Sequence, residues 1–367
     1  MARPTRETAS SVSRCRSTKL ISYAWGDKYL DELLEVTIPA ILAPGNLPHL
    51  ASIVPCEMVL LIEERAHERV SSHPNIERIQ RHCSLRLVGL DDLIAVKDKY
   101  GMALTHALHR GMGATSGNIL DTYFIFLNAD FVMADGCLSK VLERLMSGER
   151  LVAAPSYCVV SKTVIPRLRE RIDRDTGVLS IANRDLAHIA LHNLHDTIRA
   201  KTLNQRQWHF KYVDQFYWQL DRHSLLGHQM PVAIVGMRPE RFIKEPNSYW
   251  DHGFMRELCP YAEPCVLGDS DDFLMVELRE KEVAQEHLVA GPMDLKRAGR
   301  RMIMWLTQYQ REFAQYPLQP ARPGPAPDGP GGTKRACQAR ARDFVLLPAS
   351  IAVAPWTSAM DLSPEGL

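Results

Sequence analysis

The residues with the clearest chemical potential stand at the end of one apolar run. Asn128 and Asp130 follow the stretch from Thr122 to Leu127, which is short, β-prone and unbroken, as a buried strand is. The two polar residues are two positions apart, so on an extended chain their side chains point to the same side. An amide oxygen and a carboxylate that converge there could hold Mg²⁺ or Mn²⁺, which in turn holds phosphates. The simpler alternative is a strand end that only starts a turn and caps the next helix.

A second acidic cluster comes late in the chain. Asp269, Asp271 and Asp272 lie within four positions, just before an apolar run. Clustered carboxylates repel one another, which makes one of them a better proton acceptor, as a general base must be. In the alternative interpretation, Asp269 or Ser270 caps a helix.

Histidines provide further candidate metal ligands. Asp251 and His252 are adjacent, and an Asp–His pair can bind a metal or exchange a proton. His188, His192 and His195 recur at spacings of four and three, which predicts three imidazoles on one helical face. Imidazole is a common metal ligand, but the His-Glu-x-x-His pattern of metalloproteases is absent. A polar face that lines a cleft or meets solvent is the simpler interpretation of this triplet.

An aromatic segment at 208–218 contains six aromatic residues and His209. Aromatic walls suit the apolar C–H faces of sugar rings, so the segment could line an acceptor pocket. The alternative is a packed hinge, because the spacing of Phe210 and Tyr217 also fits an amphipathic core helix.

Alternating apolar segments predict the elements that carry these residues. The expected strands are 20–24, 58–62, 85–88, 122–127, 151–154 and 231–236. Amphipathic stretches separate the first five, which predicts an α/β fold with a mainly parallel sheet and helices on both of its faces. In such sheets ligands bind at the carboxyl ends of the strands, where Asn128 and Asp130 are expected.

A strand that ends in Asn128-Ala129-Asp130 and is followed by Asp135-Gly136 resembles the metal and nucleotide motif of GT-A-fold glycosyltransferases, which are nucleotide-diphospho-sugar transferases. Their usual motif is Asp-x-Asp, so Asn128 departs from it at the first position. The resemblance covers roughly residues 18 to 290, through short motifs. It implies a GT-A-like fold in which Tyr23, Ala24 and Trp25, at the end of the first strand, contact the nucleotide base. Asn128 and Asp130 would bind the rest of the nucleotide, and Asn128 would ligate a metal or hydrogen-bond the ribose.

The same resemblance implies a reaction. A sugar would pass, with inversion, from a nucleotide-diphosphate-sugar donor to a hydroxyl of a glycan or another acceptor. Asp130, Asn128 and His252 would hold the Mn²⁺ or Mg²⁺ cofactor. Asp272, or Asp271 beside it, would take the acceptor's proton.

Two other functions remain open. A nucleotidyltransferase on a related sheet should carry a Gly-rich, Lys/Arg-containing signature after its first strand, and the chain has none there. A non-catalytic GT-A-like protein that binds nucleotides or glycans, or acts as a scaffold, finds its support in the neutral Asn128. No Gly-x-Gly-x-x-Gly follows the first strand and no P-loop is present, so a Rossmann dehydrogenase or a P-loop NTPase is unsupported.

Composition excludes some partners. The formal net charge of +1 gives no reason to expect nucleic acid. The eight cysteines form no Cys-x-x-Cys pair, which favours free thiols and a cytoplasmic location. No run is long enough to span a membrane. A basic amphipathic helix is expected over 295–313, which either packs on the domain or lies on an anionic membrane surface as a peripheral contact.

Domain boundaries follow from composition. Residues 1–17 are rich in Ser, Thr and Arg and are expected to form a disordered leader. A GT-A-like α/β domain should cover 18–315, with a helical insert at about 161–225. Residues 316–367 form a Pro/Gly/Arg-rich low-complexity tail that is expected to be disordered, because it buries too little to offset its ordering entropy.

Overall fold

The computed structural model describes residues 17–95, 100–113, 119–211, 215–221, 224–229, 233–298, 300 and 318–321. The predicted leader, except for Ser17, lies outside these residues. Most of the helix predicted over 295–313 also lies outside them, as does the tail from 322 onward.

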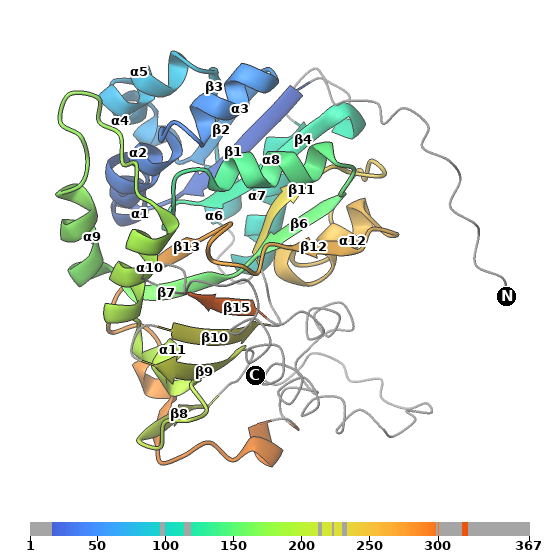
Figure 1. Ribbon diagram of the computed structural model, residues 1–367. Helices are drawn as coiled ribbons and strands as arrows, with labels where there is room; N and C mark the ends of the chain where they lie inside the picture. The colour runs from blue at the N-terminus through green and yellow to red at the C-terminus, as the bar shows by residue number, and fades with distance from the viewer. Residues whose placement is uncertain are drawn as a thin grey trace, which may run out of the picture.

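A seven-stranded sheet in the order β12-β6-β11-β4-β1-β2-β3 forms the centre of the fold (Figure 1). Its strands are β1 (Ser17–Ala24), β2 (Cys56–Ile62), β3 (Ser84–Gly89), β4 (Thr122–Asn128), β6 (Leu151–Ala154), β11 (Ala233–Met237) and β12 (Pro264–Val266). The pairs β4–β1, β1–β2 and β2–β3 are parallel, as is β6–β12, whereas β11 is antiparallel to both of its neighbours. The mainly parallel sheet predicted from the sequence is therefore confirmed.

Each face of this sheet packs against its own apolar core. Along β4, Tyr123 and Ile125 belong to one cluster and Phe124 and Phe126 to the other, because successive side chains alternate between faces. The first core takes residues from α1 (Asp27–Glu32), η1 (Leu33–Thr37), α2 (Ile38–Ile41), α3 (Leu47–Ile53) and α8 (Cys137–Met146). The second takes residues from α7 (Tyr100–Gly113), η4 (Trp250–Phe254) and α12 (Met255–Leu258). Helices on both faces are thus confirmed.

Short helices connect the strands on the side of β3. They are η2 (Glu64–Ala66), α4 (His67–Ser71), α5 (Pro74–Gln80) and α6 (Asp91–Ile94), and η3 (Ile119–Asp121) leads into β4.

A smaller sheet holds the segment that follows β4. It has the order β5-β13-β7, with β5 (Phe131–Met133), β13 (Met275–Arg279) and β7 (Ser156–Val160). β13 is antiparallel to β5 and parallel to β7. Because β5 begins directly after Asp130, this sheet fixes the position of the C-terminal end of the Asn-Ala-Asp triplet.

The middle of the chain is only partly helical. The helices are α9 (Ser161–Arg169), α10 (Asn183–His192) and α11 (Asp196–Ala200). The aromatic segment forms strands β8 (Trp208–Phe210) and β9 (Gln215–Asp221) instead of the amphipathic helix that its spacing also allowed. β9 pairs with β10 (Ser224–Gln229) and β8 with β14 (Leu288–Ala290). Aromatic residues favour half-buried sheet positions, and the pairings with the neighbouring β10 and with the distant β14 decide between strand and helix.

One short segment of the predicted tail is ordered. Leu318–Ala321 forms β15, an edge strand antiparallel to β10. Pairing with β10 supplies these residues with backbone hydrogen bonds that composition does not reveal. Pro320 is tolerated at such an edge, since only one side of the strand needs donors.

Candidate functional site

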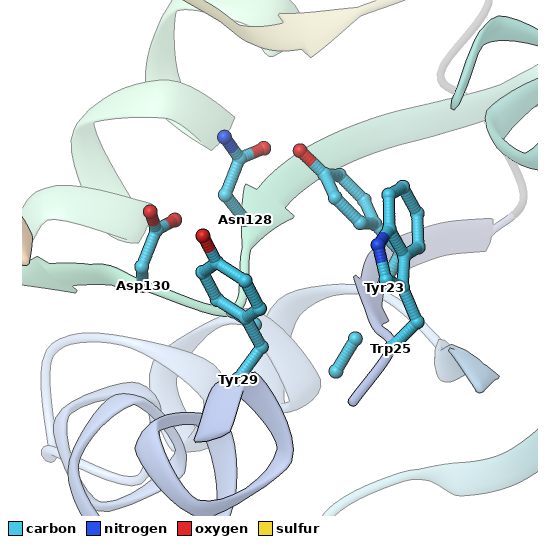
Figure 2. A pocket seen from close by; sticks show the side chains of 7 residues that line it. Tyr23, Trp25, Tyr29, Asn128 and Asp130 are labelled. Carbon is cyan, nitrogen blue, oxygen red and sulfur yellow. The ribbon is translucent and has the colours of Figure 1, made fainter. Parts of the chain in front are cut away.

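The strand register brings the predicted nucleotide-binding residues together. In the parallel pair β1–β4, Tyr23 lies opposite Asn128, so the carboxyl ends of the two strands meet at one edge of the sheet. A pocket of about 130 Å³ opens there. It is lined by Tyr23, Ala24, Trp25, Tyr29, Asn128, Ala129 and Asp130 (Figure 2). All five residues proposed from the sequence to contact the donor therefore line one pocket.

Aromatic rings form one wall of this pocket. Tyr23 and Trp25 are stacked, with ring centroids 5.4 Å apart and planes at 29°. Tyr29, on the first turns of α1, points its hydroxyl toward the space between Asp130 and Asn128 (Figure 2). Sequence reasoning missed Tyr29, although its place in the helix that starts from the end of β1 was a usable signal. The pocket can offer ring stacking on one side and oxygen ligands on the other.

Two hydrogen bonds hold the triplet in place. The Thr37 hydroxyl, at the end of η1, donates to the Ala129 carbonyl at 2.6 Å. The Leu278 amide of β13 donates to the Asp130 carbonyl at 2.9 Å. Because the backbone on both sides of the Asp130 side chain is fixed, the carboxylate is positioned by the first core and by the smaller sheet together.

A hydrogen bond to Glu63, the residue after β2, fixes the turn that follows β1. Gly26 has φ +78°, in the left-handed region that favours glycine, and its amide donates to Glu63 Oε2 at 2.7 Å. Hydrogen bonds from Arg65 and from the Gly26 amide hold the pKa of Glu63 below its usual range. Arg65 also pairs with Asp27 at 3.1 Å. This network sets the direction in which Trp25 and the first turn of α1 leave the strand.

Acidic neighbours surround Asp130. Burial, followed by the nearby Glu277 and Glu32, raises the pKa of Asp130 well above its ordinary value, while Arg279 opposes the shift. Glu277 is paired with Arg279 and accepts a hydrogen bond from Ser156 Oγ at 3.5 Å. The charge around Asp130 is therefore mostly negative, and a bound cation would stabilise its ionised form.

Glu32 is the most isolated of these carboxyls. It is 5% exposed, and its Oε2 has no hydrogen-bond partner. Burial raises its pKa to about 7, although Lys28 acts in the opposite direction. Neither Glu32 nor Glu277 was selected from the sequence. The spacing of polar residues in α1 and β13 does not indicate that both carboxylates lie near Asp130.

A divalent ion fits this pocket only in company with its ligand. The protein would supply one carboxylate, Asp130, and one amide oxygen, Asn128. Mg²⁺ is commonly held in this way, with water and substrate phosphates completing its octahedron. Within the part of the chain that the structure describes, no group of three or more His, Cys, Asp or Glu side chains could hold a metal by itself. The two ligands Asp130 and Asn128 therefore suit a metal ion that is also bound by the phosphates of the ligand.

The predicted bases lie elsewhere. Asp271 and Asp272 are in the exposed turn before β13. Asp271 pairs with Arg184 of α10 at 3.3 Å, and Asp272 lies 4.0 Å from Lys140 of α8. Neither lines the pocket. Both residues precede Met275, at the end of β13 that pairs with Met133. The hydrogen bond to the Asp130 carbonyl comes from Leu278, near the other end of β13.

His252 belongs to η4, and its side chain lies outside the described residues, as does that of Asp251. The Trp250 ring of the same helix packs edge-on against Phe126, with centroids 4.4 Å apart. Because Phe126 and Asn128 are two positions apart on β4, η4 covers the face of the sheet toward which Asn128 projects.

The histidine triplet does not share one helical face. His188 and His192 are neighbours on α10, with ring centroids 4.3 Å apart. The helix ends at His192, and His195 is the buried N-cap of α11. Its Nδ1 accepts from the Thr197 amide at 3.2 Å, and its Nε2 lies 2.9 Å from the Glu280 carbonyl. The expectation of three aligned imidazoles is wrong, because the chain turns between the second and the third.

Comparison with known proteins gives partial structural matches. No family model matches the sequence, and the search of curated proteins found no match to it. Mouse xyloside xylosyltransferase 1 superposes with a TM-score of 0.29 at 12% identity, over 42% of this chain and 58% of the other. The 4-diphosphocytidyl-2C-methyl-D-erythritol synthase of Anaerococcus prevotii superposes with a TM-score of 0.26 at 14% identity, over 46% and 66%. Both scores are low, so the fold described above rests on strand order and register. Among the described helices, none is long and apolar enough to cross a membrane.

Proposed function

We propose that the chain is a metal-assisted glycosyltransferase that binds a nucleotide-diphosphate-sugar at the carboxyl ends of β1 and β4. The observation that carries this proposal is the single pocket lined by Tyr23, Trp25, Asn128 and Asp130. Aromatic rings, an amide and a carboxylate are the groups that a base, a ribose and a cation–phosphate unit require. At about 130 Å³ the pocket holds part of such a donor, and the remainder would extend over the sheet edge.

Each residue has a distinct part in this proposal. The stacked Tyr23 and Trp25 would face the base. Asp130 would hold Mn²⁺ or Mg²⁺ with the Asn128 oxygen, and Asn128 could instead orient the ribose. The metal, when bound, neutralises charge on the leaving diphosphate. The Tyr29 hydroxyl, which points toward the space between Asp130 and Asn128 in Figure 2, would donate to a phosphate oxygen.

A thermal-shift panel tests the donor site. UDP, GDP, CMP and dTDP are each added with and without Mn²⁺ to the wild type and to Asp130→Ala. We expect one nucleotide to stabilise the wild type, more so with Mn²⁺, and to lose this effect in the variant, because ligand binding to the folded state raises the melting temperature. A capping role for Asp130 predicts instead a stability loss of about 1 kcal/mol and unchanged binding.

The acceptor's base needs a separate test. The sequence proposes Asp272 or Asp271, and Asp272→Asn should then keep nucleotide binding and abolish transfer. If both Asp272→Asn and Asp271→Asn still transfer the sugar, neither residue is the base. Their role would then be structural, in the exposed turn and in its pairs with Lys140 and Arg184. Glu277→Gln is the informative companion variant, because Glu277 is the carboxylate whose charge acts most strongly on Asp130.

A second candidate function is a non-catalytic protein that binds nucleotides or glycans. Two observations favour it: the neutral Asn128 at the first position of the triplet, and the placement of Asp271 and Asp272 outside the pocket. Normal nucleotide stabilisation without sugar transfer or donor hydrolysis would select it. A nucleotidyltransferase would instead consume a nucleoside triphosphate and release pyrophosphate.

A further inference from the structure

A second pocket, of about 240 Å³, lies in the part of the molecule that contains β8, at the bottom of Figure 1. It is lined by His209, Phe210, Lys211, Val289, Pro292, Met293, Asp294, Arg297 and Ala298. These residues come from β8, from β14 and the loop after it, and from the helical turn 295–298. None of them takes part in the pocket around Asp130.

The inner part of this second pocket is apolar and firmly supported. Phe210 is 8% exposed, and its ring lies between Lys201 Nζ, 5.0 Å from its centroid, and the His287 ring, 5.7 Å away at 86°. The Lys211 amide donates to the His287 carbonyl at 2.9 Å. Phe210 therefore offers a fixed aromatic surface, to which Val289 adds an aliphatic one.

Basic side chains surround this apolar part. Lys211, directly after β8, and Arg297, in the helical turn 295–298, both line the pocket, and His209 is tied by Nδ1 to the Gly291 carbonyl at 3.1 Å. Asp294 is the acidic side chain of the lining, and its carboxylate is engaged as a helix cap. It accepts from the Lys296 amide at 3.0 Å and from the Arg297 amide at 3.1 Å.

The capping role of Asp294 matters for the charge of the pocket. These backbone bonds, with the nearby charges of Arg300 and Arg297, hold the pKa of Asp294 below its usual range, and the bonds fix the turn that carries Arg297. The carboxylate thus stabilises the turn, and Lys211 and Arg297 line the same cavity as Phe210 and Val289. The arrangement suits a small molecule with an apolar or ring-shaped body and an anionic group.

We propose that the pocket formed by Phe210, Val289, Lys211 and Arg297 is a second ligand site, which binds a small phosphorylated molecule through its ring and its phosphate together. The site is independent of the nucleotide pocket and does not rest on the function proposed for it.

Phenyl phosphate is the probe that tests this combination. Its binding to the full chain is followed by ligand-observed NMR titration and compared with that of inorganic phosphate and of phenol. We expect phenyl phosphate to bind more tightly than either fragment. Lys211→Ala combined with Arg297→Ala should weaken phenyl phosphate binding by about tenfold, because charge-assisted hydrogen bonds are lost at a partly exposed site.

Matched variants separate the pocket from general surface charge. Lys296→Ala removes a cation next to Arg297 that does not line the pocket, and it should bind as the wild type does. Val289→Asp places a negative charge in the cavity and should abolish binding. Val283→Asp makes the same change at a valine that is likewise 41% exposed but lies outside the cavity, and it should have no effect.

Three results would overturn the proposal: equal affinity of phenyl phosphate for the double variant and the wild type, an affinity no higher than that of phenol or phosphate alone, or an equal loss in Lys296→Ala. Asp130→Ala should leave phenyl phosphate binding intact. A wild type that binds phenyl phosphate but none of the nucleotides would contradict the glycosyltransferase proposal and leave this site standing.

Discussion

At the scale of single residues, Glu32 has the most unusual environment. It is a buried carboxyl with an oxygen that lacks a hydrogen-bond partner, and it faces the acidic surroundings of Asp130. Burial raises its pKa from 4.5 to about 7, so the folded state binds a proton more tightly than the unfolded chain does. A group of this kind stabilises the fold below pH 4.5, and this contribution is lost as the pH rises through 7.

Glu32→Gln should therefore stabilise the protein at alkaline pH. The neutral amide has a similar shape and no charge to bury, so the variant's free energy of unfolding should exceed that of the wild type at pH 8 by on the order of 3 kcal/mol. At pH 5 the difference should be much smaller. Urea unfolding at both pH values measures it. The exposed Glu282→Gln, in the turn after β13, serves as the control. A Glu32→Gln difference that is the same at both pH values would argue against a buried, titrating Glu32.

The same scale shows what a sequence can tell about the site. Tyr23, Trp25, Asn128 and Asp130 follow from strand ends, which an apolar run reveals. Glu32 and Glu277 do not, since their closeness to Asp130 results from packing of α1 and β13 around the triplet. A search for polar and charged residues in the elements that flank each strand end would have included Tyr29 and Glu32, but not Glu277, which lies 147 positions after Asp130.

At the scale of elements, η1 and β13 hold the triplet between them. Thr37 is fully buried, and its hydroxyl bond to the Ala129 carbonyl joins the first helical region to the end of β4. A buried carbonyl that loses its donor costs about 1–3 kcal/mol. The hydrogen bond therefore contributes to the stability of the fold. It also fixes the position of the backbone next to Asp130.

Thr37→Val should affect both properties. The variant keeps the side-chain shape but lacks the donor, so we expect a loss of about 1–2 kcal/mol in the free energy of unfolding and a weaker Mn²⁺-dependent nucleotide response. Thr105→Val is a matched control, because Thr105 is also fully buried and its hydroxyl bonds the Gly101 carbonyl of its own helix, at 3.0 Å. A normal nucleotide response in Thr37→Val would show that β13 alone positions Asp130.

Elements were predictable where one local pattern decides them. The strands β1, β2 and β4 are unbroken apolar runs, and their parallel pairing followed from the alternation with helices. The aromatic segment fits the periods of both a helix and a strand, and its pairing with the adjacent β10 and with β14, far along the chain, made it a pair of strands. The turn between His192 and His195 was equally hidden, because it depends on a cap formed by the side chain of His195 and the Thr197 amide.

At the scale of the whole molecule, one core runs through several layers. The first apolar cluster contains Leu20 of β1, Met275 of β13, Leu186 of α10 and Tyr217 of β9. The backbone of Lys201, which flanks the second pocket, accepts a hydrogen bond from the Tyr217 amide at 3.1 Å. Elements around both pockets thus share this core, so we expect a single cooperative unfolding transition that reports on either ligand.

This shared core makes a crossed experiment decisive. The two pockets have no lining residue in common. The increments in melting temperature from the Mn²⁺–nucleotide and from phenyl phosphate should therefore add in the wild type. Asp130→Ala should lose only the first increment, and Lys211→Ala with Arg297→Ala only the second. Loss of both increments in either variant would mean that the two ligands use one site, whereas a combined increment well above the sum would reveal coupling through β13 and β7, the strands that lie between Asp130 and Lys201.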